Sequence, residues 1–175
     1  MDEGLATDDQ SVRAPAGGDR FRERRRVFGS MSIDRKVSAS DTNGGFFVIE
    51  NTDARKGGPP RHYHHRQEER FHVIDSEYII EIGDEHHQLG PGDSVLAPRI
   101  VPRVWARAGE GGGRLIVAFQ PAGQMEACFG ASGNAKGTPA REEPQILFGS
   151  RGTPSDRTTP TDPMACPGPG TQGCR

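Results

Sequence analysis

The stretch that decides the fold of this chain is Pro59-Pro60-Arg61-His62-Tyr63-His64-His65-Arg66-Gln67-Glu68-Glu69. It gathers three of the six histidines of the chain and two carboxylates. Successive side chains of an extended strand point to opposite faces, so His62 and His64 share one face while Tyr63 and His65 point the other way. Two imidazoles on one face of a strand supply two ligands to a metal ion. His62 and His64 are therefore the first candidate site residues.

Short apolar segments separated by turn residues surround this stretch. Apolar side chains alternate in one segment and form short runs in three others, at residues 31–37, 46–49, 71–74 and 78–82. Clusters of Gly, Asp, Asn and Pro between them are typical of turns. Strands that recur about every 8–12 residues favour an antiparallel sandwich or barrel.

The two ends of the chain lack this pattern. Residues 1–26 show no apolar periodicity, and residues 131–175 are rich in Pro, Thr and Gly. Such segments bury too little apolar surface to offset the entropy lost on folding. We predict a disordered N-terminal arm at 1–26, a barrel at 27–130, and a tail at 131–175 that is partly ordered and then disordered. Apolar residues at i, i+3 and i+4 predict a short helix that begins near Pro121.

The composition narrows the range of partners. The formal net charge of −2 provides no strong positive field for nucleic acid. No segment approaches the roughly 18–20 apolar residues of a membrane span, and no signal segment is evident. We predict a small-molecule partner, no nucleic acid, no membrane and a cytoplasmic location. The three cysteines, Cys128, Cys166 and Cys174, form no CxxC pair, which favours reduced thiols.

The histidine stretch resembles the first signature of the cupin superfamily, G-x5-HxH-x3,4-E-x6-G, through His62, His64 and Glu69. Gly92 and Pro98 resemble the start of the second signature, G-x5-PxG-x2-H. The spacing of the two segments looks like that of small single-domain cupins often described as quercetin-dioxygenase-like. The resemblance covers roughly residues 27–130. It implies an all-β fold, a single cupin jelly-roll β-barrel with a short C-terminal helix, and pairing into a homodimer.

Several positions depart from these signatures. Ile100 and Arg103 stand where the second signature has glycine and histidine, and Ser76 stands where the first ends on glycine. Gly57 is one residue closer to His62 than the pattern asks. The resemblance implies that cupins hold their metal with the HxH histidines, the glutamate and that last histidine. Arg103 cannot replace this ligand, because a guanidinium stays protonated and has no free lone pair.

The remaining set, His62, His64 and Glu69, offers two imidazoles and one carboxylate. Such a set leaves coordination positions open and suits Fe(II), and Mn, Ni and Zn are compatible with the same residue types. We predict that these three residues bind a divalent metal ion (Fe, Mn, Ni or Zn). Arg103 would then orient an anionic part of the substrate or of an oxygen adduct.

The same arginine also favours a metal-free site. A guanidinium repels a divalent cation, whereas beside Glu69 it forms a charge-assisted pair or binds a substrate carboxylate or phosphate. In that case His62 and His64 would act as general acid and base, and Arg103 would stabilise a developing oxyanion or enolate.

Three classes of function follow from these alternatives. The first is a metal-dependent oxidoreductase, dioxygenase-like, that acts on a phenolic or other cyclic metabolite. The second is a redox-neutral cyclase, isomerase or lyase with His62, His64 and Arg103 as catalytic residues. The third is a non-catalytic module that binds a small acid, because a fold alone does not fix function.

Overall fold

The structure is a computed structural model, and it describes residues 11–23, 25–27 and 31–132. The described residues form mainly β-strands, with one short 3-10 helix and one α-helix. In chain order the elements are β1 (Arg25–Val27), β2 (Met31–Val37), η1 (Ala39–Thr42), β3 (Phe47–Asp53), β4 (Glu68–Asp75), β5 (Tyr78–Ile82), β6 (Glu85–Leu89), β7 (Ser94–Ala97), β8 (Arg103–Arg107), β9 (Gly113–Gln120) and α1 (Met125–Ser132). The predicted all-β fold with a short C-terminal helix is confirmed.

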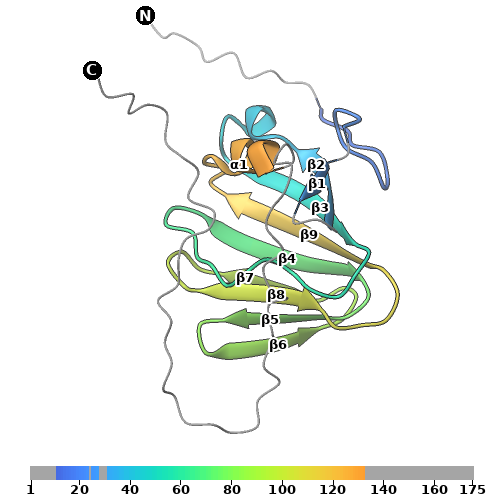
Figure 1. Cartoon of the computed structure of the whole chain (residues 1–175). Helices are drawn as coiled ribbons and strands as arrows, with labels where there is room; N and C mark the ends of the chain where they lie inside the picture. The colour runs from blue at the N-terminus through green and yellow to red at the C-terminus, as the bar shows by residue number, and fades with distance from the viewer. Residues whose placement is uncertain (1–10, 24, 28–30, 133–175) are drawn as a thin grey trace, which may run out of the picture.

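The strands form two antiparallel sheets (Figure 1). The larger sheet has six strands in the order β1-β2-β3-β9-β4-β7, and the smaller has three in the order β6-β5-β8. Strand β9 lies between β3 and β4, so that segments far apart in the sequence are neighbours in the larger sheet. Two antiparallel sheets connected in this non-sequential order are the jelly-roll arrangement that the sequence predicts.

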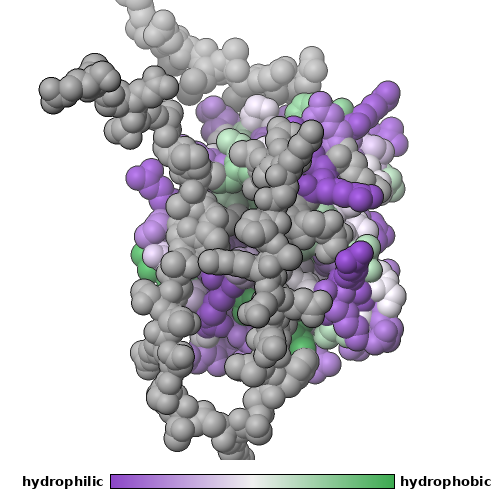
Figure 2. Space-filling view, viewed as in Figure 1, coloured by the Kyte–Doolittle hydropathy of each residue, from purple (hydrophilic) through white to green (hydrophobic). Residues whose placement is uncertain are grey.

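Apolar side chains from both sheets form the core between them. Along β9, Leu115, Val117 and Phe119 are buried, while the residues between them are half-buried. The rings of Phe71 on β4 and Trp105 on β8 have their centroids 6.5 Å apart and connect the two sheets. On the face shown in Figure 2, hydrophilic residues predominate among the coloured ones. Each sheet therefore buries one face against the other, as expected for a sandwich.

Strand β4 carries an acidic residue at a core position. Glu69, Phe71 and Val73 are buried at alternating positions along this strand. Glu69 pairs with Phe119 of β9 on one side and with Ala97 of β7 on the other. Both neighbouring residues are apolar, so the carboxylate depends on partners that come from outside the larger sheet.

The segment before β4 is attached to β8 of the smaller sheet. Gly57 pairs with Arg107, and His62 pairs with Arg103 through backbone hydrogen bonds of 2.7 and 2.9 Å. A Cβ atom added to Gly58 would lie 1.7 Å from the carbonyl oxygen of Trp105. Only glycine fits this close approach of two backbones. The glycine thus helps to fix the position of the histidine stretch on the barrel.

Two turns keep a left-handed backbone without a glycine. Ser76 has a φ of 73° and Ile100 a φ of 65°, a region that residues with a Cβ atom, and β-branched ones above all, seldom adopt. Both residues stand where the cupin signatures have glycine. The surrounding structure therefore imposes these turns against the local preference of the residues.

Part of the predicted N-terminal arm lies against the barrel. The buried carboxylate of Asp19 accepts hydrogen bonds from the backbone N–H, Nε and a terminal nitrogen of Arg35 on β2, at 2.8, 3.0 and 3.0 Å. The guanidinium carbon of Arg35 also lies 4.5 Å from the ring centre of Phe21. A single acidic residue in a polar segment gives no periodic signal, so the sequence could not reveal this contact. The limits of arm, barrel and tail stay predictions.

Helix α1 begins at Met125, four residues after the predicted start at Pro121. The apolar residues that predicted it, Met125, Cys128 and Phe129, are all buried.

Cys128 takes part in a disulfide bond, so the prediction of reduced thiols is wrong for this residue. Spacing among three cysteines cannot exclude one pair.

The tail from 133 onward lies outside the described residues. Among the described helices, none combines the length and the apolar character that crossing a bilayer requires.

The close approach at Gly58 gives a first testable prediction. The substitution Gly58→Ala should lower the free energy of unfolding by about 3 kcal/mol, because the added methyl group can be accommodated only by moving backbone. Gly112→Ala is a matched control, since its added Cβ atom would make only an ordinary contact of 3.6 Å with the carbonyl oxygen of Asp53. Denaturant unfolding of both variants checks this expectation. Equal stability of the two variants would contradict it.

The Asp19–Arg35 pair gives a pH-dependent prediction. Burial opposes ionisation of Asp19, but the hydrogen bonds from Arg35 and nearby backbone N–H groups outweigh it and lower its pKa from 3.8 to about 2. Because the pKa is lower in the folded state, the stabilisation is complete above about pH 4 and is lost as the pH falls toward about 2. Asp19→Asn should therefore cost about 2 kcal/mol at neutral pH and little near pH 2.

The matched control for Asp19→Asn is Glu23→Gln. The exposed carboxylate of Glu23 contacts the same arginine, at 3.0 Å, from the solvent side. Removal of this screened charge should leave stability nearly unchanged at every pH. Denaturant unfolding measured across this pH range checks both variants, and a cost of Asp19→Asn that does not vary with pH would speak against the ionic contact.

Candidate metal centre

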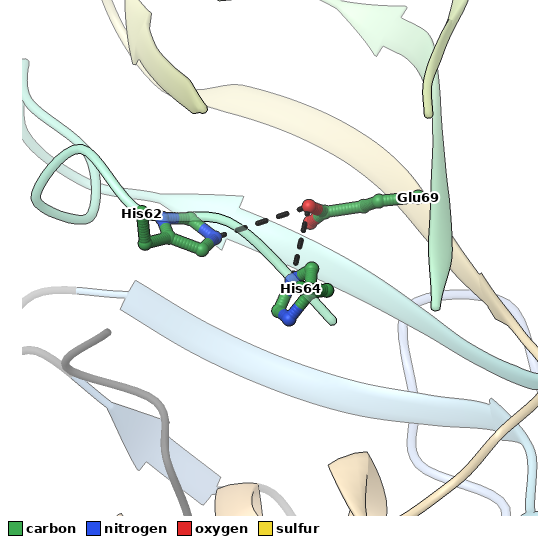
Figure 3. A group of neighbouring side chains, drawn as sticks. All are labelled: His62, His64 and Glu69. Carbon is green, nitrogen blue, oxygen red and sulfur yellow. Dashed lines mark ion pairs between the residues drawn. The ribbon is translucent and has the colours of Figure 1, made fainter. Parts of the chain in front are cut away.

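His62, His64 and Glu69 converge inside the barrel, as Figure 3 shows. The imidazoles come from the segment before β4, and the carboxylate comes from the second residue of that strand. The exposed fractions of the three residues are 2%, 4% and 3%. One potential ligand atom from each residue lies within 4.8 Å of the other two. The structure thus brings together the three residues that the sequence indicates as ligands.

The ring of His62 is oriented by the backbone of its own segment. Its Nδ1 lies 2.8 Å from the carbonyl oxygen of Pro60, which can only accept a hydrogen bond. Nδ1 therefore carries the proton, and in the neutral ring Nε2 holds the lone pair. This Nε2 lies 3.9 Å from Oε2 of Glu69. An imidazole whose far nitrogen donates to a carbonyl group is the arrangement that metal-binding histidines usually have.

His64 presents a buried nitrogen without a hydrogen bond. Its Nε2 lies 3.3 Å from Oε2 of Glu69, but the atom makes no hydrogen bond with any described residue. The ring packs edge-on against Phe119, with the centroids 5.6 Å apart. A buried polar atom that lacks a partner is costly and points to a partner that the protein chain itself does not provide.

The charges of the cluster favour an ionised carboxylate at Glu69 and a neutral imidazole at His62. Burial alone raises the pKa of Glu69, but the contacts with His64, His62 and Arg103 outweigh it, and the pKa lies below its ordinary value. Burial lowers the pKa of His62 and outweighs the attraction of the nearby Glu69. A neutral imidazole and an ionised carboxylate are the protonation states that metal coordination requires.

Arg103 lies beside Glu69 with its side chain fully buried. One terminal nitrogen is 3.2 Å from Oε2 of Glu69, and the other donates to the carbonyl oxygen of Pro98 at 2.8 Å. Further hydrogen bonds from Nε and this second terminal nitrogen reach the carbonyl oxygen of Val101, at 3.3 and 3.2 Å. The guanidinium therefore uses its donors on the protein itself, on one carboxylate and on the loop between β7 and β8.

The cluster opens into a cavity with a mostly apolar wall. The polar lining residues are His62, His64, Glu69 and Asn51. The apolar lining residues are Met31, Ile33, Ile49, Pro59, Trp105, Val117, Phe119 and Phe129. Arg103 does not line this cavity. Its contact with a substrate therefore stays a prediction.

Sequence reasoning missed Asn51 as a residue of the site. It lies on β3 in the alternating series Phe47, Ile49, Asn51, whose members all face the interior. A polar residue at an inward position of a strand is the signal that could have revealed it. Trp105 both lines the cavity and packs against Phe71.

The other histidines lie away from this cluster. His65, His72 and His86 are exposed, and His87 is half-exposed. The carboxylate of Glu68 is near Arg99, at 3.4 Å, on the outside of the barrel. The alternation of a strand thus separates the convergent residues from their sequence neighbours.

The three clustered residues fit a divalent metal ion. Ligand atoms bind such an ion at about 2.0–2.2 Å, so neighbouring ligand atoms around it are about 3.0–3.5 Å apart. The ligand atoms of the cluster lie within 4.8 Å of one another and would move closer together to bind one ion. Two imidazoles and one carboxylate suit Fe, Mn, Ni or Zn and leave positions open. The nearby guanidinium of Arg103 opposes the ion electrostatically and partly offsets the charge of Glu69.

Comparison with solved structures shows cupin-like folds at low sequence identity. KdgF from Halomonas sp. has 18% identity and a TM-score of 0.56, over 67% of this chain and 98% of that one. An RmlC-like cupin from Shewanella frigidimarina has 18% identity and a TM-score of 0.56, over 67% of this chain and 96% of that one. The polyketide cyclase RemF from Streptomyces resistomycificus has 17% identity and a TM-score of 0.54, over 63% of this chain and 80% of that one. These likenesses show the fold alone. No curated protein sequence matches the chain significantly.

Comparison with family models adds sequence information to this fold. Residues 51–119 match the model of the cupin domain, a range that contains His62, His64 and Glu69 as well as Arg103. The quercetin-dioxygenase-like subtype stays a prediction. The matched segment, the two-sheet barrel and the solved structures of the same fold agree that residues 51–119 carry a cupin domain.

Proposed function

We propose that this protein is a metal-dependent enzyme that oxidises a small phenolic or other cyclic metabolite in the manner of a dioxygenase. The observation that carries the proposal is the convergence of the unpartnered Nε2 of His64 with Nε2 of His62 and a carboxylate oxygen of Glu69. A role in small-molecule chemistry agrees with the cupin fold and with a cavity that is open beside the three residues.

A divalent ion at this centre would supply Lewis-acid activation and, if redox-active, a route for electrons to dioxygen. The chain itself orients the ligands. Pro60 holds the ring of His62, and Arg103 holds the carboxylate of Glu69. Both contacts reduce the reorganisation that binding requires. In a dioxygenase reaction both atoms of O2 enter the product, so the chemistry needs no external reductant.

The cavity wall supports a cyclic substrate. Aromatic rings of Trp105, Phe119 and Phe129 line it together with aliphatic side chains. Flat apolar walls bind ring systems by contact area, while the few polar groups fix their orientation. The apolar surroundings also limit the access of water to the reacting groups.

A second candidate function is a redox-neutral cyclase, isomerase or lyase. The observation that favours it is the 3.2 Å contact between Arg103 and Glu69, which occupies part of the carboxylate without a metal ion. In such an enzyme His64 would move a proton through its buried Nε2, and the Arg103–Glu69 pair would hold the charge balance of the site. The fold likeness to a polyketide cyclase is compatible with this candidate.

Other properties of the protein stay predictions. These are the pairing into a homodimer, the cytoplasmic location and a partner set of small molecules without nucleic acid or membrane. A disulfide bond at Cys128 is more typical of an oxidising compartment than of the predicted cytoplasmic location.

The metal centre gives a third testable prediction. His62→Ala and His64→Ala should each lower the affinity for a divalent ion at least about 100-fold, because each removes one of three ligands. His65→Ala is the matched control, since this exposed neighbour points away from the cluster. Elemental analysis and titration with Fe(II), Mn(II), Ni(II) and Zn(II) provide the measurement. Metal binding that survives either cluster substitution would rule out this ligand set.

Oxygen uptake by the same proteins separates the two candidate functions. With catechol as a phenolic probe, the metal-loaded wild-type protein and His65→Ala should consume O2, and the two cluster variants should not. Turnover of a cyclic substrate without oxygen uptake would favour the redox-neutral candidate.

Arg103 gives a fourth prediction. Arg103→His should bind a divalent ion at least about 10-fold more tightly than Arg103→Gln, because both substitutions remove the guanidinium but only histidine adds a ligand. The backbone pairing of this residue with His62 places its side chain at the cluster. Isothermal titration of both variants tests the difference. Equal affinities would show that this position does not reach the metal.

A further inference from the structure

Asn51 is a polar residue in an otherwise apolar part of the cavity wall. It lies on β3, its exposed fraction is 1%, and it lines the cavity together with His62, His64 and Glu69. Its neighbour at the next inward position, Ile49, also lines the cavity. A leucine of similar volume at position 51 would continue this apolar surface without any unsatisfied polar atom. The buried amide therefore lowers the stability of the fold relative to an apolar side chain of similar size.

The orientation of the amide is fixed by two other buried residues. Nδ2 of Asn51 donates to Oδ1 of Asp53 at 2.8 Å. The hydroxyl of Tyr78 donates to Oδ2 of the same carboxylate, also at 2.8 Å. Burial, and the proximity of Asp53, raise the pKa of Tyr78, which keeps the hydroxyl protonated as a donor. With both carboxylate oxygens engaged, the amide nitrogen must face Asp53.

The carbonyl end of the amide is left without a partner. Oδ1 of Asn51 is fully buried and accepts no hydrogen bond from any described residue. An unsatisfied buried acceptor costs about 1–3 kcal/mol. The Tyr78–Asp53–Asn51 chain therefore holds an empty acceptor rigidly in the wall of the cavity, which is how a binding site presents a polar group to a ligand.

We propose that Asn51 is a substrate-binding residue whose Oδ1 accepts a hydrogen bond from a hydroxyl group of an uncharged, hydroxylated ring. The proposal rests on the function proposed above and specifies the substrate class of the same cavity. Asp53 and Tyr78 are positioning residues, because they act on the ligand only through the amide of Asn51.

The charges around the cavity support an uncharged donor over an anion. No Lys or Arg side chain belongs to the described cavity lining, and the donors of Arg103 are used on Glu69 and on loop carbonyls. The residues that line the cavity include Glu69 and Asn51, whose carboxylate and carbonyl oxygens both repel a carboxylate. A hydroxyl donates to either acceptor. The ring would lie against the aromatic wall.

Three small probes test this inference on the protein as purified. Phenol carries the hydroxyl donor, toluene has nearly the same shape without it, and benzoate carries a negative charge. Binding of each probe is measured by ligand-observed NMR titration to the wild-type protein, to Asn51→Leu and to Ile49→Val. The Ile49 variant is the matched control, since it changes the same wall and keeps the amide.

The expected result is a preference that depends on the amide. The wild-type protein should bind phenol about 3- to 10-fold more tightly than toluene, the size of one neutral hydrogen bond, and should bind benzoate more weakly than either. Asn51→Leu should lose the preference for phenol over toluene while still binding toluene. Ile49→Val should keep that preference.

The outcomes also separate this inference from the proposed function. A wild-type protein that binds toluene as well as phenol, that prefers benzoate, or that binds none of the probes overturns the inference, and so does a preference for phenol that survives in Asn51→Leu. Titration with Zn(II) accompanies each measurement, and Asn51→Leu should bind the ion as the wild type does. Failure of metal binding with an intact phenol preference would overturn the metal-dependent function and leave the role of Asn51 standing.

Discussion

The site of this protein depends on one buried negative charge, the carboxylate of Glu69. It lies between apolar neighbours on the larger sheet, where an unpaired charge would be strongly unfavourable. The contact that makes it tolerable comes from Arg103 on the smaller sheet. The charge therefore connects the two sheets chemically at the point where they enclose the cavity, and its partners decide what the cavity can bind.

The arginine changes the character of this centre relative to the cupin signature. A buried ion pair adds little net stability, because the loss of hydration offsets the attraction between the charges. What the Arg103–Glu69 pair provides is orientation, since it fixes the carboxylate and occupies the guanidinium with loop carbonyls. The lone pairs that could bind a metal ion are then those of the two imidazoles and of the remaining carboxylate positions.

Much of the fold could be predicted from the sequence, because periodic patterns report it. Alternation in the strands and the HxH spacing indicated the barrel and the convergence of His62, His64 and Glu69. Single long-range contacts left no such pattern. The burial of Asp19 against Arg35, the engagement of Arg103 with loop carbonyls and the disulfide of Cys128 each depend on tertiary neighbours that no local spacing encodes. Asn51 was missed for the opposite reason, since its inward position was visible but the cavity beside it was not.

The left-handed turn at Ile100 has a consequence for how this domain can vary. Its amide N–H donates to the carbonyl oxygen of His64 at 2.9 Å, and the residues on either side of the turn, Pro98 and Val101, are the two whose carbonyls Arg103 grips. The guanidinium thus stabilises a turn whose left-handed backbone isoleucine disfavours. Arg103 therefore supports the backbone at Ile100, and substitutions at positions 100 and 103 are expected to have non-additive effects on stability.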